Sequence, residues 1–290
     1  MATGASWTGC RGKSQALGDA DGAASAIHSQ NFWRMFMTDN QKIALITGAS
    51  RGLGRNTAIH LAEKGVGVVI TYLSNKDEAD TAIKEIEAKG SKGVALRLDT
   101  SKSDTFEVFK QLFAHSLKQT WGRKDFDYLV NNAGFGIAKS ILETTEEEFD
   151  KLVNTQYRGL FFITQKLIPL LKDGGSIVNI TSGLTRFALG NNSAYAMTKG
   201  GVEVFTRYLA KELGRRQITA NSVAVGATET DFGGGVIRDN PEYHKLISSI
   251  VALGRPGKPD DIGRMIASLL SDDNHWINAQ RIEVSGGQLI

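Results

Sequence analysis

The sequence predicts an α/β protein built on a single doubly wound parallel sheet with helices on both of its faces. Short apolar runs rich in β-branched residues alternate with longer amphipathic stretches along most of the chain. Such alternation is typical of parallel strands joined by right-handed crossovers. Most of the apolar runs carry no polar alternation, which indicates strands covered on both faces. Glycine and polar residues cluster directly after several runs, where open α/β sheets bind their ligands.

The individual elements follow from these patterns in chain order. The apolar runs predict strands at 43–46, 65–72, 93–99, 126–134, 176–183, 218–226 and 281–287. Helical periodicity predicts helices at 51–65, 75–90, 103–121, 144–172, 193–216 and 259–271. The helix at 144–172 opens with a threonine that has a glutamate three residues later, a capping-box signature. The order of elements predicts a Rossmann-type fold.

The chain of 290 residues divides into an N-terminal extension and one folded domain. Residues 1–38 are rich in Gly, Ala and Ser, and they lack both a strand-like apolar run and the features of a secretory signal. We expect this segment to be disordered, left over from cloning, or the product of a start assigned too far upstream. Residues 39–290 form the predicted domain. The TGAS stretch at 3–6 has no strand before it, and Trp7 stands where a triphosphate-binding loop needs glycine.

Composition narrows the classes of partner. With 41% hydrophobic residues, 22% charged residues and a net charge of +3, the chain has neither a nucleic-acid-binding nor a membrane-binding character. The one cysteine, Cys10, excludes an intrachain disulfide, and no Cys or His cluster has metal-ligand spacing. No run approaches the ~20 apolar residues of a membrane span. We therefore expect a cytoplasmic protein with no metal, nucleic acid or membrane partner.

The stretch TGASRGLG at 47–54 is the better candidate for binding phosphate. A strand leads into it and a helix leads out, which directs backbone N–H groups toward a dinucleotide pyrophosphate. Gly48 permits the tight turn, Gly52 lets the backbone approach the phosphates, and Gly54 allows close packing of helix and strand. The alternative is an ordinary glycine-rich turn between a strand and a helix.

The stretch YAMTK places Tyr195 and Lys199 four residues apart on one helical face. A phenol titrates near pKa ~10, and a neighbouring ammonium favours its ionised form, so this pair can exchange a proton with a carbonyl or alcohol oxygen. Ser182 ends the strand before this helix and could hydrogen-bond the same oxygen. Asn154 is a polar residue amid apolar helical neighbours. Taken singly, each has an ordinary structural explanation, as a surface pair or a satisfied helix asparagine.

Together these residues resemble the short-chain dehydrogenase/reductase family. The resemblance covers about residues 42–287 and rests on TGASRGLG, NNAG at 131–134, YAMTK and the closing WINAQRIEVSGG, together with Asp99, Asn154 and Ser182. It implies a Ser182–Tyr195–Lys199 catalytic centre, with Asn154 supporting a water-linked proton relay.

The resemblance also implies the contacts of a nicotinamide cofactor. Asp99 would contact the adenine, Asn131 the ribose and Thr230 the nicotinamide carboxamide. Val225 departs from the family pattern, which usually has proline before Gly226. The expected cofactor-binding residues are Gly48, Ser50, Arg51, Gly52, Leu53, Gly54, Ser74, Asn75, Asp99, Asn131, Ala133, Gly134, Tyr195, Lys199, Gly226, Thr228 and Thr230.

The end of the second strand favours NADP(H) over NAD(H). An acidic residue there would bind the ribose 2′-hydroxyl of NAD and repel a 2′-phosphate, but Tyr72 occupies that place. Ser74 and Asn75 follow it, and Arg51 in the glycine turn can form a charge-assisted contact with phosphate.

The substrate is less defined than the cofactor. Residues 228–256 resemble the family's mobile substrate lid, with a hinge at Gly233-Gly234-Gly235. The subgroup that looks most similar reduces 3-oxoacyl thioesters carried on an acidic acyl carrier protein. Arg215 and Arg216 stand where those enzymes are basic, whereas Asp173 stands at a second place where they are also basic.

Other functions remain open at this stage. A sugar, polyol or other small-ketone dehydrogenase of the same family would share every motif. A non-catalytic dinucleotide-binding sensor would keep the glycine turn, but it would have no reason to keep Ser182, Tyr195 and Lys199 together. The apolar stretch at 158–172 carries large residues around more than one helical face, which together with the resemblance predicts a homotetramer.

Overall fold

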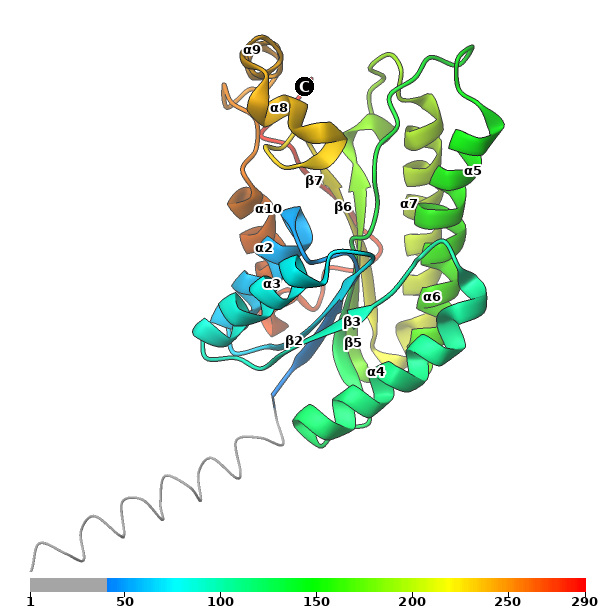
Figure 1. The fold of residues 1–290 in the computed structure, drawn as a ribbon, viewed down its shortest axis with the longest axis vertical. Helices are drawn as coiled ribbons and strands as arrows, with labels where there is room; N and C mark the ends of the chain where they lie inside the picture. Colours follow the sequence, from blue (N-terminus) through cyan, green and yellow to red (C-terminus); the bar gives the residue numbers. More distant parts are fainter. Residues whose placement is uncertain (1–40) are drawn as a thin grey trace, which may run out of the picture. The chain divides into compact units, whose positions relative to one another are not determined.

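Seven parallel strands form the central sheet of residues 41–290, the part of the chain that this computed structural model describes (Figure 1). The strands are β1 (Ile43–Ile46), β2 (Gly67–Tyr72), β3 (Gly93–Arg97), β4 (Phe126–Asn131), β5 (Leu171–Ser182), β6 (Thr219–Val225) and β7 (Arg281–Val284). Their order in the sheet is β3-β2-β1-β4-β5-β6-β7, and every neighbouring pair is parallel. Strand order reverses between β1 and β4, which confirms the predicted doubly wound fold.

The expected extension at 1–38 and the first TGAS stretch lie outside the described residues. Within 41–290, the helices are α2 (Gly52–Glu63), α3 (Lys76–Ala88), α4 (Phe106–Trp121), α5 (Glu146–Val153), α6 (Gly159–Leu167), α7 (Ser193–Leu213), α8 (Val236–Asp239), α9 (Pro241–Ser249) and α10 (Pro259–Leu269). None of them is both long enough and apolar enough to cross a membrane.

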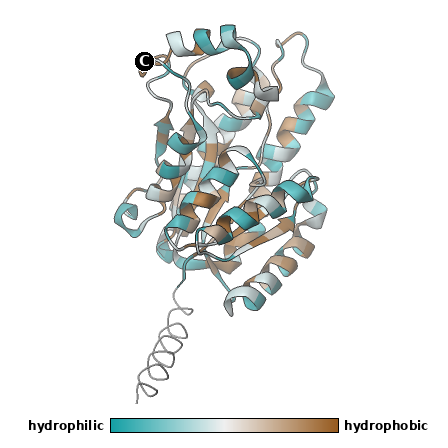
Figure 2. Ribbon diagram, turned by 60° about the vertical axis from the view of Figure 1, so that its left-hand side comes forward, coloured by the Kyte–Doolittle hydropathy of each residue, from teal (hydrophilic) through white to brown (hydrophobic). Residues whose placement is uncertain are grey.

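Two apolar layers hold the helices against the sheet. Along β1, Ala44 and Ile46 point to one face while Ile43 and Leu45 point to the other, as the two-residue period of a strand requires. Helices α2, α3 and α10 cover the first face, and α4, α6 and α7 cover the second (Figure 1). Figure 2 shows the hydrophobic strands between helices whose outer faces are largely hydrophilic. Burial on both faces explains why the strands lack polar alternation.

The prediction of a single helix at 144–172 is wrong in detail. The capping box forms at Thr145 and Glu148 and starts α5, but a π-helical turn, η3 (Asn154–Arg158), separates α5 from α6. The helix then ends in a short 3₁₀ turn, η4 (Ile168–Leu170), which contains Pro169. Because proline cannot donate a backbone hydrogen bond, the chain leaves the helix there and enters β5 at Leu171.

Three glycines shape the segment expected to be a lid. A 3₁₀ turn, η7 (Phe232–Gly235), lies near the start of the 228–256 segment, and α8 and α9 follow. Gly233, Gly234 and Gly235 have φ values of 62°, 77° and 76°. Left-handed backbone conformations at consecutive positions are unfavourable for residues other than glycine. This turn therefore requires the three glycines that the sequence supplies.

Candidate active site

The carboxyl ends of β1, β4, β5 and β6 bring most of the predicted residues to one edge of the sheet. The glycine turn follows β1, Asn131 ends β4 and leads into residues 132–134, Ser182 ends β5, and Gly226 begins the segment after β6. This edge includes the point where strand order reverses, which is the usual ligand site of an open α/β sheet.

The glycine turn has the shape of a phosphate cradle. A side chain at Gly48, which has φ of 62°, would place its Cβ 2.8 Å from the Ala133 Cα. At Gly54 it would lie 2.8 Å from the Ala49 Cα, so this glycine permits close packing of α2. Gly52 has φ of 58°, and a Cβ there would meet no atom of the described residues within 4 Å. Gly52 therefore leaves open the space that the cofactor's phosphates would need.

The start of α2 is available to an anion. Within residues 41–290, the Arg51 side chain makes no capping hydrogen bond at the N-terminus of this helix. The first turn of α2 also holds no acidic residue. The positive end of the helix dipole and its free backbone N–H groups therefore suit a dinucleotide pyrophosphate. Ser50 and Leu53 lie half-buried in the same turn.

Polar groups at the ends of the strands hold this turn in place. The Thr47 hydroxyl accepts hydrogen bonds from the backbone N–H groups of Asn132 and Ala133, each at 3.0 Å. The Asn132 amide donates to the carbonyls of Thr47 and Gly48 at 2.9 Å. The Gly48 N–H donates to the Thr71 hydroxyl at 3.0 Å. Thr47 and Asn132 belong to the TGASRGLG and NNAG motifs, whereas Thr71 lies outside both, and its position near the end of β2 was the one signal in the sequence that could have identified it.

Tyr195 and Lys199 lie buried on the face of α7 that turns toward the sheet. The Lys199 Nζ donates to the Ile180 carbonyl at 3.0 Å and lies 5.6 Å from the centre of the Tyr195 ring. Burial lowers the pKa of the Lys199 ammonium to about 8. Burial also raises the pKa of the Tyr195 phenol well above its usual value, although a hydrogen bond with Ser182 opposes that rise. At neutral pH the phenol is therefore protonated, the form that can donate a proton.

Ser182 is fixed by its own turn at the end of β5. Its hydroxyl accepts a hydrogen bond from the Leu184 N–H at 3.3 Å, and its carbonyl accepts one from the Thr185 hydroxyl at 2.8 Å. Ser182 and Tyr195 are 7% and 8% exposed. The structure thus brings three of the four expected catalytic residues, Ser182, Tyr195 and Lys199, into one buried cluster.

Asn154, the fourth, begins the π-helical turn η3 and is half-buried. Its side chain has no hydrogen bond among the contacts within residues 41–290. Gln156, two residues later, is fully buried, and its Nε2 donates to the Phe135 carbonyl at 2.8 Å. The sequence motifs did not select Gln156, because helical phase in a π-helical turn does not follow the regular α-helical period.

Asn131 is buried at the end of β4 within a chain of polar side chains. Its Nδ2 donates to the Thr164 hydroxyl at 2.9 Å and to the Asn179 Oδ1 at 2.8 Å. Asn179 in turn donates to the Thr206 hydroxyl at 2.9 Å. The Asn131 Oδ1 is buried and has no hydrogen-bond partner within the described residues, so it is free to receive a donor.

Several expected cofactor residues at the ends of β2 and β3 already have local partners. The Asn75 side chain accepts a hydrogen bond from the Glu78 N–H at 3.1 Å and caps α3. The Asp99 Oδ1 accepts hydrogen bonds from the backbone N–H of Ser101 at 2.9 Å and from its hydroxyl at 2.6 Å. Ser74 is exposed. Asn75 therefore shapes the helix start, in addition to any contact it makes with a cofactor.

The segment after β6 is anchored to the C-terminal loops. The Gly226 N–H donates to the Val284 carbonyl at 3.0 Å. Thr228 and Thr230 are buried, and the Thr230 hydroxyl accepts a hydrogen bond from the Phe232 N–H at 3.2 Å. These contacts hold the turn in the absence of the proline that the family usually has at Val225.

An aromatic side chain from the expected lid lies against Tyr195. The rings of Phe232 and Tyr195 are 5.8 Å apart at an angle of 59°. Gly136, in the loop after β4, makes room for Phe232, since a Cβ at Gly136 would lie 2.8 Å from the ring. Phe135 and Leu184 pack against the small buried cluster that Tyr195 forms with Leu152 and Ala194. The Tyr195 ring therefore has an aromatic neighbour on the side of Phe232.

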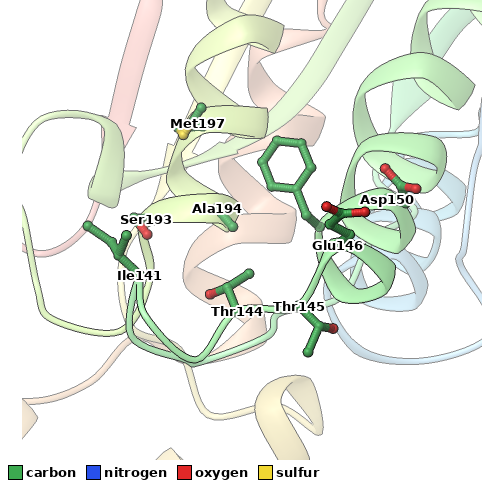
Figure 3. Close-up of a pocket in the computed structure, with 9 residues that line it drawn as sticks. Ile141, Thr144, Thr145, Glu146, Asp150, Ser193, Ala194 and Met197 are labelled. Carbon is green, nitrogen blue, oxygen red and sulfur yellow. The ribbon is translucent and has the colours of Figure 1, made fainter.

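A separate hollow of about 470 Å³ lies between the 141–150 segment and the start of α7 (Figure 3). It is lined by Ile141, Thr144, Thr145, Glu146, Phe149, Asp150, Ser193, Ala194 and Met197. Ser182, Tyr195 and Lys199 do not line it, so chemistry at Tyr195 does not occur there. Among residues 41–290, no group of three His, Cys, Asp or Glu side chains could hold a metal ion.

Comparison with known proteins places the chain in a family. A family model described as enoyl-(acyl carrier protein) reductase matches residues 48–288. A hydroxynaphthalene reductase-like protein of Metarhizium brunneum is 35% identical over 260 residues, which cover 86% of this chain and 95% of that protein.

Two solved structures extend the comparison. A promiscuous reductase that catalyses keto-reduction at C1 in lugdunomycin biosynthesis has a TM-score of 0.81 and 35% identity, covering 86% of this chain and 97% of its own. The landomycin C-6 ketoreductase with bound NADP and rabelomycin has a TM-score of 0.78 and 35% identity. The match covers 86% of this chain and 96% of the ketoreductase. The chain belongs to the short-chain dehydrogenase/reductase family of oxidoreductases.

Proposed function

We propose that the chain is an NADPH-dependent ketoreductase that acts on a ketone in a ring fused to an aromatic ring. The observation that carries this proposal is the buried Ser182–Tyr195–Lys199 cluster with the Phe232 ring lying against the phenol. The family membership of the chain and the hydroxynaphthalene named for a relative point to the same reaction.

The bound cofactor would supply a hydride to the carbonyl carbon. The Tyr195 hydroxyl donates its proton to the carbonyl oxygen, and the product is a secondary alcohol. Ser182 hydrogen-bonds the same oxygen and orients the carbonyl toward the phenol. Lys199 stabilises the phenolate that remains, and Asn154, half-buried on η3 outside this cluster, would help to return a proton from solvent through water. The reverse reaction uses the same groups with the proton moving in the opposite direction.

The predicted residues account for a preference for NADP(H) over NAD(H). The pyrophosphate would bind at the start of α2, on the open side of Gly52. Arg51 would pair with the 2′-phosphate, and Tyr72 introduces no negative charge to repel it. Asn131, Asp99 and the other expected residues would contact the ribose, the adenine and the nicotinamide. The cofactor bound to the landomycin ketoreductase is NADP, which supports this preference.

The surroundings of Tyr195 favour an aromatic substrate over a sugar. The Phe232 ring lies against the Tyr195 ring, and Phe135 and Leu184 pack against the buried cluster that contains Tyr195. A planar fused ring can stack against such side chains, and the association buries apolar area. A sugar or polyol would instead leave its hydroxyl groups without partners on this apolar wall.

A carrier-bound 3-oxoacyl thioester is the second candidate, and the charges at Arg216 weaken it. The Arg216 Nε pairs with the Asp173 carboxylate at 2.7 Å. The same guanidinium donates to the carbonyls of Ile168 and Leu171. Arg216 is the residue expected to contact an acidic carrier protein. It is instead paired with Asp173 of the same chain, so its charge is already neutralised locally.

Turnover with a panel of ketones tests the substrate class. We expect NADPH oxidation to be fastest with a ketone in a ring fused to an aromatic ring, such as 2-tetralone, measured as kcat/KM by absorbance at 340 nm. A short 3-oxoacyl thioester and a sugar-derived ketone are the comparisons. If either of these is preferred over every aromatic ketone, the aromatic assignment is wrong while the reductase assignment stands.

We also propose that the protein is a cytoplasmic homotetramer. The outer faces of α5, η3, α6 and α7 expose large apolar side chains: Phe149, Tyr157, Phe161, Met197, Val204 and Tyr208. Large exposed apolar side chains are typical of a protein–protein interface when they gather on one surface, and two of these, Phe149 and Met197, also line the hollow of Figure 3. Light scattering at micromolar concentration should give four times the mass of the chain, and a monomeric mass would exclude the assembly.

A further inference from the structure

We infer that Gln288 is a positioning residue for the turn at 226–230, and that its amide fixes the backbone expected to contact the nicotinamide. The inference rests on the proposed function, because it requires this turn to hold the nicotinamide half of the cofactor. Neither the motifs nor the comparisons assign a role to Gln288.

Gln288 is a buried side chain whose amide oxygen serves this turn. It is 3% exposed, although glutamine usually lies at the surface of a protein. Its Oε1 accepts a hydrogen bond from the Ala227 N–H at 2.9 Å. A Cβ built on Gly226 would lie 3.0 Å from the same oxygen. The Gln288 amide therefore packs against the two residues with which the turn begins.

The segment after β7 holds the Gln288 backbone in a fixed position. The Arg186 Nη2 donates to the Gln288 carbonyl at 2.7 Å, and the same guanidinium pairs with the Glu283 carboxylate at 2.7 Å. Gln288 also pairs with Val251 in an isolated antiparallel bridge. Because these contacts already order the Gln288 backbone, little further conformational entropy is lost when its side chain binds Ala227.

The start of the turn needs support from outside. Val225 stands where the family usually has proline, which would have fixed the backbone φ angle at that position. A cavity of about 150 Å³ also borders the turn, and Ala227, Thr228 and Ser285 are among the residues that line it. Side chains facing a cavity lack packing partners on that side. The hydrogen bond to Gln288 therefore supplies a restraint that neither proline nor packing provides here.

Ala227 connects Gln288 to the residues expected to contact the nicotinamide. The next residue is Thr228, whose hydroxyl donates to the Gly226 carbonyl at 3.0 Å. Thr230, the residue expected to contact the carboxamide, is buried three positions after Ala227. A displacement of the Ala227 peptide would move Thr228 and Thr230 with it, because the segment between them is short. Gln288 thus acts on the nicotinamide through this backbone and not by direct contact.

Two substitutions and a matched control test the inference. Gln288→Met has nearly the length of glutamine but no oxygen to accept the Ala227 N–H, whereas Gln288→Glu keeps an acceptor oxygen. Gln165→Met is the control, because Gln165 lies exposed on α6. Two ligands are compared by isothermal titration: NADPH, and adenosine 2′,5′-bisphosphate, which carries the 2′-phosphate but no nicotinamide.

The inference predicts a loss confined to the nicotinamide half. Gln288→Met should bind NADPH about 3- to 10-fold more weakly than the wild type, the usual range for one hydrogen bond. Its affinity for adenosine 2′,5′-bisphosphate should not change, because that ligand does not reach the turn. Gln288→Glu should bind NADPH more tightly than Gln288→Met does. Gln165→Met should bind both ligands as the wild type does.

A second readout uses the protein without cofactor. Hydrogen exchange at the Ala227 amide, followed by mass spectrometry of peptides that cover 225–231, reports on the hydrogen bond itself. Gln288→Met should exchange this amide faster by about the same factor, because the amide has lost its acceptor. Gln288→Glu and Gln165→Met should retain the wild-type protection.

Equal losses of both ligands in folded Gln288→Met protein would overturn the inference, because they would indicate a general loosening of the site. Unchanged NADPH affinity, or unchanged exchange at Ala227, would also reject the role of Gln288 and would leave the proposed function standing. Failure of the wild-type protein to bind NADPH would instead reject the proposed function and the inference together. If Gln288→Met does not fold, Gln288→Asn, whose amide is one carbon shorter, takes its place with the same predictions.

Discussion

Replacing Tyr195 by phenylalanine should reduce ketone turnover by about 10²- to 10⁴-fold, the usual contribution of a positioned proton donor. The substitution removes one hydroxyl from a side chain that is 8% exposed, so the phenyl ring keeps its contacts with Phe232. Hydride could still be delivered to the carbonyl carbon, but no group of the protein would then neutralise the developing oxyanion in time. The loss should fall on kcat, because the hydroxyl acts at the transition state more than in ground-state binding.

The control for this variant is Tyr208→Phe on the same helix. Tyr208 is 62% exposed, and its hydroxyl has no part in the proposed chemistry. Tyr208→Phe should turn over at the wild-type rate, while Tyr195→Phe should still bind NADPH with near wild-type affinity by fluorescence titration. Full activity of Tyr195→Phe would show that the proton comes from elsewhere.

Replacing Arg51 by alanine should weaken NADPH binding by about 10- to 100-fold, which corresponds to the loss of one charge-assisted hydrogen bond. Binding of NADH should change little, because NADH has no 2′-phosphate for Arg51 to contact. The variant therefore separates the phosphate contact from a general effect on the glycine turn. Isothermal titration with both cofactors gives the two affinities directly.

Arg264→Ala is the matched control for the charge change. Arg264 is an exposed arginine of α10 whose one described ion pair is with Asp260 at 3.3 Å. The Arg264→Ala variant should leave the affinities for NADPH and NADH unchanged. Equal losses of NADPH and NADH binding in Arg51→Ala would mean that Arg51 supports the turn rather than the 2′-phosphate.

The parts of the site that depend on local sequence were predictable. Gly48 and Gly52 have positive φ values, and Gly54 packs at the start of α2, as the turn motif predicted. Tyr195 and Lys199 share the buried face of α7 because a spacing of four residues places them there. These features require only a strand, a turn and a regular helix in the right order.

Features that depend on contacts between distant segments were not predictable. Arg216 and Asp173 are 43 positions apart, and nothing local indicates that they pair. Phe232 reaches Tyr195 only because Gly136, from a third segment, leaves room for it. Gln156 was missed for a different reason, since a π-helical turn changes which side chain faces the sheet without any motif to mark it.

The most direct test of the central claim is to follow the hydride. Wild-type protein would be incubated with NADPH carrying deuterium at the transferred position and with 2-tetralone, and the alcohol would be analysed by mass spectrometry. Direct reduction at the Tyr195 centre predicts one deuterium on the carbinol carbon and one NADPH consumed per alcohol formed. Tight NADPH binding with no deuterated alcohol from any aromatic ketone in the panel would contradict the proposed reductase.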